Sequence, residues 1–196
     1  YAAWTLVRTM GLSLGPHVPL RQPAERLYHM VHGVASKVRE KREPLCAASA
    51  SASLGHLVGR YYVQEALAMP SVSQVARMAE AIRSAFLRRL FDLPWLDAKT
   101  KRAAIAKASA ISFRIAQPQT PDLLHASDIA AWYSDLNVTH SLFDNEWRAQ
   151  AWRVRKAYSY VGGELNRGAL GNLLPTDVKA EYVPAFNEMD LAAGIL

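Results

Sequence analysis

Histidine and cysteine are the side chains of this sequence best suited to holding a metal ion, and we considered them first. His29 and His32 lie three residues apart, so a helix would place both on one face. Zinc sites on helices more often use a four-residue step with an acidic partner, and the sequence contains no His-Glu-x-x-His. His56, His125 and His140 are isolated in sequence. We therefore predict ordinary packing for the first two histidines and no metal site within this chain.

Nucleophilic catalysis is not indicated either. No Ser-His-Asp or Cys-His set can be argued from the spacing, and Cys46 has no basic neighbour in sequence that would activate its thiol. Cys46 is the only cysteine. In an intact cytosolic protein a lone cysteine is by default a free, buried thiol, whereas in a piece of an extracellular protein its disulfide partner would lie outside the piece. We predict no catalytic residue in this chain.

The tripeptide Asn137-Val138-Thr139 is an N-glycosylation sequon in a turn-rich segment. It makes Asn137 a candidate glycosylation site and suits the extracellular interpretation of Cys46. Because a three-residue pattern arises often by chance, the sequon supports that interpretation only together with other features.

The composition is that of a folded globular protein, with 51% hydrophobic and 20% charged residues. The net charge of +6 raises the question of nucleic-acid binding. One basic run covers Lys37 to Arg42, and a second, Arg148 to Lys156, follows Asp144 and Glu146. Neither run fits a nucleic-acid-binding motif, and no aromatic–basic alternation suggests base stacking. We predict solvated helix faces and no nucleic-acid partner. No apolar run reaches the length of a membrane-spanning helix.

Helical periodicity runs through most of the chain and predicts a mainly α fold. Tyr1 to Val7 is typical of a helix interior. A stripe from Leu27 to Val38 predicts a helix ending in the charged run up to Glu43-Pro44. The Ala/Ser-rich residues 45–53 are either a linker or a closely packed helix N-terminus, and a helical stripe resumes from Leu54 to Tyr62.

Two longer helices are predicted next. Pro70 followed by Ser71-x-x-Gln74 fits a helix start, and an apolar stripe follows, formed by Val72, Val75, Met78, Ile82, Phe86 and Leu90. Four charged residues lie off this stripe and are expected to face water: Arg77, Glu80, Arg83 and Arg88. Asp97 is expected to cap a helix from Ala98 to about Ala116.

The remaining elements lead to the C-terminal end. We predict a short helix over 123–133, a long helix over 143–161 that stops at Gly162-Gly163, and a connector over 164–176. Val178–Tyr182 and Glu188–Leu191 are expected to be extended. The chain is thus expected to be helical up to the connector, with a short β element at its end.

Several segments match, in order and spacing, the motifs of one known protein family. Val178-Lys-Ala-Glu-Tyr182 and Leu191-Ala-Ala-Gly-Ile-Leu196 are similar to that family's Val-Asn-Ala-x-Tyr and Pro-Ala-Gly-Ile-Leu. Gly59-Arg-Tyr-Tyr-Val63 is similar to Gly-x-Leu-Tyr-Val, and Met78 to Pro118 follows the family pattern, including Leu-x-Trp-x-Asp and Thr-Lys. In these segments the chain resembles the neprilysin and endothelin-converting-enzyme family of zinc metallopeptidases. The resemblance covers most of the chain, most clearly residues 59–118 and 178–196.

The resemblance implies a two-lobed zinc metallopeptidase that cleaves small peptides. Residues 1–176 would belong to the helical lobe that encloses the substrate, incomplete at its N-terminus, and residues 177–196 would begin the catalytic lobe. In the family, the zinc-binding helix follows soon afterwards, and zinc-activated water attacks the peptide with a glutamate as general base. We therefore expect both ends of this chain to be internal to a longer protein. The chain alone, cut off before the zinc site, is expected to be inactive.

The resemblance also assigns roles to single residues. Lys179 and Ala180 occupy the positions of an Asn-Ala pair that hydrogen-bonds the substrate backbone, by addition of the peptide to a sheet edge. Lysine offers only donors, whereas asparagine offers a donor and an acceptor, so a non-catalytic peptide- or protein-binding relative is the alternative function. Cys46 corresponds to a disulfide-bonded cysteine, whose partner would lie outside this chain. The implied partners are peptide substrates and the missing catalytic lobe. The implied location is the extracellular side of the plasma membrane, through an N-terminal anchor outside this chain, or the secreted fraction.

Overall fold

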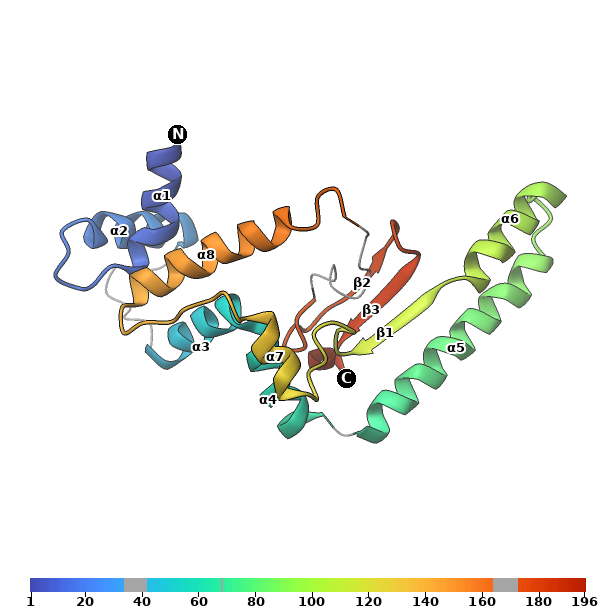
Figure 1. Ribbon diagram of the computed structural model, residues 1–196. Helices are drawn as coiled ribbons and strands as arrows, with labels where there is room; N and C mark the ends of the chain where they lie inside the picture. Colours follow the sequence, from blue (N-terminus) through green and yellow to red (C-terminus); the bar gives the residue numbers. More distant parts are fainter. Residues whose placement is uncertain (34–41, 68, 164–172) are drawn as a thin grey trace. The chain divides into compact units, whose positions relative to one another are not determined.

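The computed structural model describes residues 1–33, 42–67, 69–163 and 173–196. The chain divides into two compact units, one formed by Tyr1–Leu54 and Ala131–Leu165, the other by Gly55–Ala130 and Asn166–Leu196. Helices dominate, and one small sheet lies in the second unit (Figure 1). The predicted mainly α fold with a short β element is confirmed.

Helices are the only regular secondary structure among the described residues of the first unit. It contains α1 (Ala2–Met10), the short 3-10 helix η1 (Gly11–Ser13), α2 (Arg21–His32), α3 (Arg42–Ser53) and α8 (Leu142–Tyr158). Its buried apolar side chains are Met10, Ala24, Ala149 and Trp152. α8 packs against α1, η1 and α3, so the last long helix of the chain closes a core begun by the first.

Three expectations for this unit were wrong. α2 ends at His32, because Gly33 adopts the left-handed conformation (φ 65°) that terminates helices; Val34 and Val38 lie outside the described residues. Pro44 does not end a helix but lies in the first turn of α3, where a missing backbone N–H costs nothing. The Ala/Ser-rich stretch is helical, so the linker interpretation was also wrong.

The second unit combines helices with a three-stranded sheet. Its elements are α4 (Gly55–Ala66), α5 (Met69–Phe91), α6 (Ala98–Ser109), β1 (Ser112–Ala116), β2 (Ala180–Val183), β3 (Glu188–Ala192) and the 3-10 helix η3 (Ala193–Ile195). α7 (Ala126–Trp132) spans the boundary between the units. The predicted cap is confirmed, since the Asp97 carboxylate accepts from the backbone N–H groups of Lys99 and Thr100 at the start of α6.

The helix predicted to reach Ala116 is wrong beyond Ser109. Residues 112–116 instead form β1, a strand whose buried face carries Arg114 and Ala116. β1 pairs in parallel with β3. Because β3 is far from β1 in sequence, this pairing cannot be predicted from the residues around β1. The local signal was the alternation around Phe113 and Ile115, which favours a strand, but the Ala/Lys-rich run before it hid the change of period.

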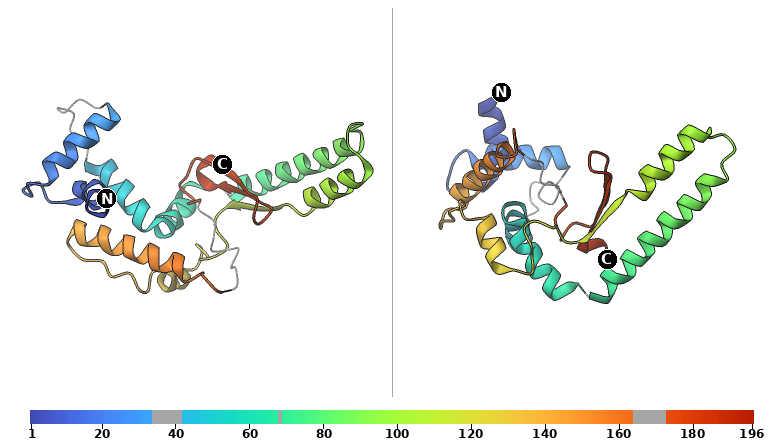
Figure 2. Two further views of the ribbon diagram at one scale, coloured as in Figure 1. Left: turned by 90° about the horizontal axis from the view of Figure 1, so that it is seen from above. Right: turned by 45° about the vertical axis from the view of Figure 1, so that its right-hand side comes forward.

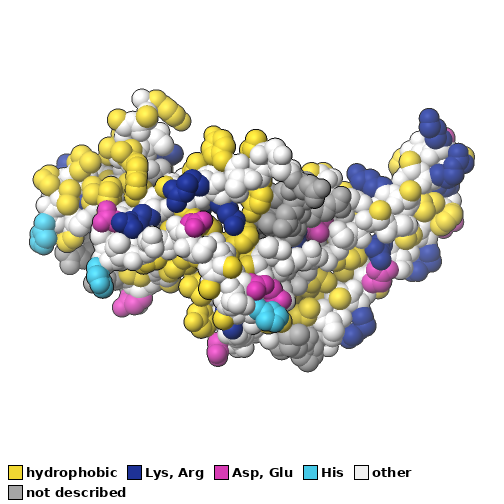
Figure 3. Space-filling view, in the orientation of Figure 1, with side chains coloured by type: hydrophobic (Ala, Val, Ile, Leu, Met, Phe, Trp, Pro, Cys, Tyr) yellow, Lys and Arg dark blue, Asp and Glu magenta, His cyan; other side chains and the backbone are white. Residues whose placement is uncertain are grey.

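α5 and α6 form an antiparallel hairpin, with α5 also packed against β1 (Figure 2). Leu90 is buried, whereas Met78, Ile82 and Phe86 are each more than half exposed, so the predicted apolar stripe is only partly covered within the described residues. Arg83 does not face water as expected. Its guanidinium lies over the Phe113 ring, 5.4 Å from the centroid, and donates to the carbonyl of Ile111 at 2.8 Å. Arginine and lysine side chains gather on the hairpin (Figure 3).

Candidate functional site

The candidate site in the second unit is the open edge of its sheet. The strand order is β1-β3-β2, so β2 is an edge strand, and within the described residues no further strand pairs with it. β2 runs antiparallel to β3, with Ala180 opposite Leu191 and Tyr182 opposite Met189. The backbone N–H of Ala192 donates to the carbonyl of Lys179 at 3.2 Å.

That single bond defines which main-chain groups of β2 remain available. Opposed residues of an antiparallel pair alternate between hydrogen-bonded and non-hydrogen-bonded positions. Because Lys179 and Ala192 form a hydrogen-bonded pair, the main-chain groups of Glu181 also point toward β3. The N–H and C=O groups of Ala180 and Tyr182 therefore point to the open edge, where an added strand would meet them.

A tight contact with η3 positions the chain as it enters β2. The backbone N–H of Gly194 donates to the carbonyl of Pro175 at 2.8 Å, and a Cβ on Gly194 would lie 2.5 Å from the carbonyl oxygen of Asp177. Only glycine allows this approach. The Asp177 carboxylate in turn accepts from the N–H of Leu174 at 2.9 Å, which closes a local turn just before β2.

The turn between β2 and β3 is held by Asn187, which adopts a left-handed conformation (φ 52°). Its side-chain amide donates to the carbonyl of Lys107 on α6 at 2.9 Å, and its Oδ1 accepts from the Tyr182 hydroxyl at 2.9 Å. The Lys107 ammonium lies 6.0 Å from the centre of the Tyr182 ring. The edge strand is therefore tied to α6 as well as to β3.

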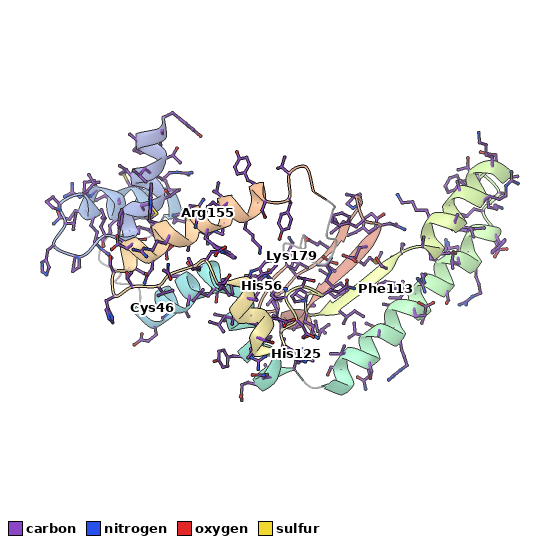
Figure 4. All side chains as sticks on the ribbon, in the orientation of Figure 1. Cys46, His56, Phe113, His125, Arg155 and Lys179 are labelled. Carbon is purple, nitrogen blue, oxygen red and sulfur yellow. The ribbon has the colours of Figure 1, made fainter. Side chains whose placement is uncertain are left out.

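Lys179, immediately before β2, forms an ion pair along the strand (Figure 4). Its Nζ donates to Glu181 Oε2 at 2.8 Å, and the lysine side chain is 58% exposed. Residues two apart in an extended chain lie on one face, so the pair runs beside the open edge. Its hydrogen bond to Glu181 raises the pKa of Lys179, and the ammonium stays charged at neutral pH.

The same face of the sheet carries a buried cluster of charges. Arg114 on β1 forms an ion pair with Glu188 on β3, and its Nε lies 3.4 Å from Asp190 Oδ1. All three residues are less than a tenth exposed. The register places Arg114 directly opposite Asp190, and Asp190 directly opposite Glu181. A row of charges thus crosses the sheet to the edge strand.

Two buried carboxyl groups share one guanidinium in this cluster. Burial raises the pKa of Asp190 to about 6; the Arg114 guanidinium opposes the rise, while Glu188 and Glu181 add to it. Neither carboxylate oxygen of Asp190 has a hydrogen-bond partner among the described residues. A proton on Asp190 could be shared with Glu188, which would neutralise the excess charge.

The other residues considered as candidate sites are distant from β2 in sequence. Cys46 is exposed on α3, so the buried-thiol alternative was wrong. Asn137 is exposed between α7 and α8. The His32 ring stacks on Tyr28, with 4.2 Å between centroids, and His125 contacts Asp122 at 3.0 Å. In the part of the chain that the structure describes, no group of three potential ligands could hold a metal ion, and no helix is long and apolar enough to cross a bilayer.

Sequence reasoning placed Lys179 and Ala180 on an extended segment but missed what surrounds them. Glu181, Arg114 and Asp190 were not singled out. An available signal was the alternation of Glu188 and Asp190 within a predicted strand, which puts two acids on one face. The arginine that faces them is 74 residues before Glu188, and no local pattern predicts that pairing.

Comparison with solved structures identifies the fold as that of zinc metalloproteases. The chain superposes on the zinc metalloprotease Zmp1 of Mycobacterium tuberculosis with a TM-score of 0.81 and 23% identity, over 99% of this chain and 27% of that one. It superposes on PepO of Lactobacillus rhamnosis with a TM-score of 0.79 and 21% identity, over 96% of this chain and 28% of that one.

The sequence comparisons agree with the fold. The profile of peptidase family M13 matches residues 1–118. An endothelin-converting enzyme homolog of Locusta migratoria is 30% identical over the whole chain, and Neprilysin-3 of Drosophila melanogaster is 28% identical. The chain belongs to peptidase family M13. It covers 26% and 24% of these two relatives, about a quarter of their length.

Proposed function

We propose that this chain is part of a neprilysin-like zinc metalloendopeptidase and that β2 holds the peptide substrate. The observation that carries the proposal is the open edge of β2, with the main-chain groups of Ala180 and Tyr182 directed outward. A peptide that adds to such an edge gains main-chain hydrogen bonds whatever its side chains are. Lys179 and Ala180 are the proposed substrate-binding residues.

The proposal extends to the longer protein. Residues 1–176 supply the helical, substrate-enclosing lobe, and residues 177–196 begin the catalytic lobe; β1 contributes a strand to the sheet of that lobe. Zinc belongs to the longer protein, and we assign no catalytic step to a residue of this chain. The proposal also includes a disulfide at Cys46 and a glycan at Asn137. It places the longer protein outside the cell, either anchored to the membrane or secreted. The exposure of both residues supports it.

The second candidate function is a non-catalytic relative that binds peptides or proteins through the same edge. Lys179 at the usual asparagine position favours it. Both functions predict peptide binding, and they differ only in whether hydrolysis follows.

The coding sequence downstream of Leu196 discriminates between the two functions. We expect a His-Glu-x-x-His motif within a few dozen codons, because this arrangement supplies two zinc ligands and a general base on one helix face. The measurement is transcript sequencing across the gene. A complete coding sequence without the motif would exclude the peptidase and leave the binding relative.

Main-chain recognition by β2 is tested with the chain itself and a blocked peptide, acetyl-tetraalanine amide. We expect millimolar or tighter binding, seen by NMR as shifts of the amide resonances of residues 180–183. Ala180→Pro should weaken it about threefold to tenfold, because one net hydrogen bond is lost. Proline is tolerated on an edge strand where the N–H faces solvent.

The matched control changes the ligand instead of the protein. A peptide with N-methylated amides has the same side chains but lacks donors, so its binding should be weakened similarly. Equal binding of the methylated peptide, or no shift in β2 at millimolar peptide, would contradict edge docking.

A further inference from the structure

Lysine at position 179 raises a chemical question for the proposed docking edge. A side-chain amide offers a donor and an acceptor to a peptide backbone, whereas an ammonium group offers donors only. Considered alone, Lys179 removes the acceptor. The structure shows that Lys179 is not alone, because its ammonium is bonded to Glu181.

We propose that Lys179 and Glu181 act together as one composite recognition group for a peptide backbone, with lysine as donor and glutamate as acceptor. The inference rests on the proposed function and concerns Glu181, a residue to which that proposal assigns no role. The ion pair is neutral overall, as an amide is, and it presents both kinds of hydrogen-bonding group beside the main-chain groups of Ala180.

The contacts of the pair support this role. The ammonium has three N–H donors and uses one for Glu181 Oε2, so two remain for a ligand. The second carboxylate oxygen, Oε1, makes no hydrogen bond with the described residues and remains available as an acceptor. The lysine side chain is 58% exposed and the glutamate side chain 24%, so both are accessible from the open edge.

The buried cluster explains why Glu181 turns toward Lys179. The register places Glu181 directly opposite Asp190, which already lies beside Glu188 with Arg114 as their shared cation. Like charges repel across a strand pair. The Glu181 carboxylate is therefore disfavoured over the cluster and favoured beside the Lys179 ammonium, which fixes the pair at the edge.

The test is a double-mutant cycle with acetyl-tetraalanine amide, whose lack of charged side chains isolates backbone recognition. We expect Lys179→Asn to bind within about twofold of the parent chain, because one amide replaces the composite group. Glu181→Met should weaken binding about threefold to tenfold in the parent chain, since it removes the acceptor and the partner of the ammonium. The same change in the Lys179→Asn background should alter binding less than about twofold. Glu65→Met, at an exposed position on α4, is the control and should have no effect.

Each outcome separates the inference from the proposed function. Equal effects of Glu181→Met in the two backgrounds, or no effect in either, would overturn the composite group while leaving edge docking intact. An increase in peptide affinity of about tenfold or more from Lys179→Asn would show that lysine at this position only weakens backbone recognition. That result would also overturn the inference. No binding of the peptide at β2 by the parent chain would overturn edge docking and with it this inference. Amide spectra of each variant establish that the sheet is folded.

Discussion

Replacing Arg114 with methionine is expected to lower the free energy of unfolding of the sheet-containing unit by about 3–5 kcal/mol at pH 7. The guanidinium is the shared cation of Glu188 and Asp190, and all three side chains are less than a tenth exposed. Without it, two carboxylates remain in a low-dielectric site with no compensating charge, and removing one partner of a buried ion pair costs more than the pair contributes. Urea unfolding, with hydrogen exchange of the β3 amides as a local probe, measures the loss.

The loss should shrink at pH 5, because Asp190, whose pKa is raised to about 6, then takes up a proton and becomes neutral. Adding Glu188→Gln and Asp190→Asn to the arginine variant should likewise recover part of the stability. Arg88→Met, at an exposed position on α5, is the control and should change the unfolding free energy by less than about 0.5 kcal/mol. A loss below about 1 kcal/mol for Arg114→Met, or one independent of pH, would contradict the buried cluster.

Replacing Asp190 with asparagine is expected to stabilise the same unit above pH 6. Because the folded-state pKa of about 6 lies above the unfolded value near 3.8, the folded state binds the extra proton. The stability linked to this group is therefore fully present below about pH 4 and is lost as the pH rises through 6. One pKa unit corresponds to about 1.4 kcal/mol, so the loss approaches about 3 kcal/mol at pH 8.

Asparagine resembles the protonated carboxyl group and does not ionise. Asp190→Asn should therefore match the parent chain at pH 4 and exceed its stability by up to about 3 kcal/mol at pH 8. Unfolding free energies measured in urea from pH 4 to 8 give the two profiles. Asp92→Asn, at an exposed position, serves as the control and should leave the profile unchanged. Parallel profiles for Asp190→Asn and the parent chain would show that Asp190 is already ionised in the folded state at low pH.

Much of the helical architecture could be predicted because its causes lie within a few residues of one another. The Asp97 cap is local and was predicted correctly. The start of α5 was predicted to within a residue, since the helix begins at Met69 and Pro70 lies in its first turn, so Ser71 is not its N-cap. The end of α2 at Gly33 was also encoded locally, by a glycine that adopts φ above zero. The prediction nevertheless extended the helix beyond Gly33, because the apolar periodicity continues to Val38. β1 was missed because a five-residue strand next to an Ala/Lys-rich helix has little local signal, and its partner is in β3.

The same division applies to the candidate site. The residues of β2 were recognised from their order and spacing, and the sequence by itself determined the family, most of the helices and the extended character of residues 178–182. Only the tertiary structure placed β2 at the edge of the sheet, turned the main-chain groups of Ala180 and Tyr182 outward, and brought Arg114 beside Glu188 and Asp190. Helix caps and periodicity depend on neighbours three or four residues away, whereas strand order and buried ion pairs depend on partners tens of residues apart. Contacts of that second kind exist only once the chain has folded.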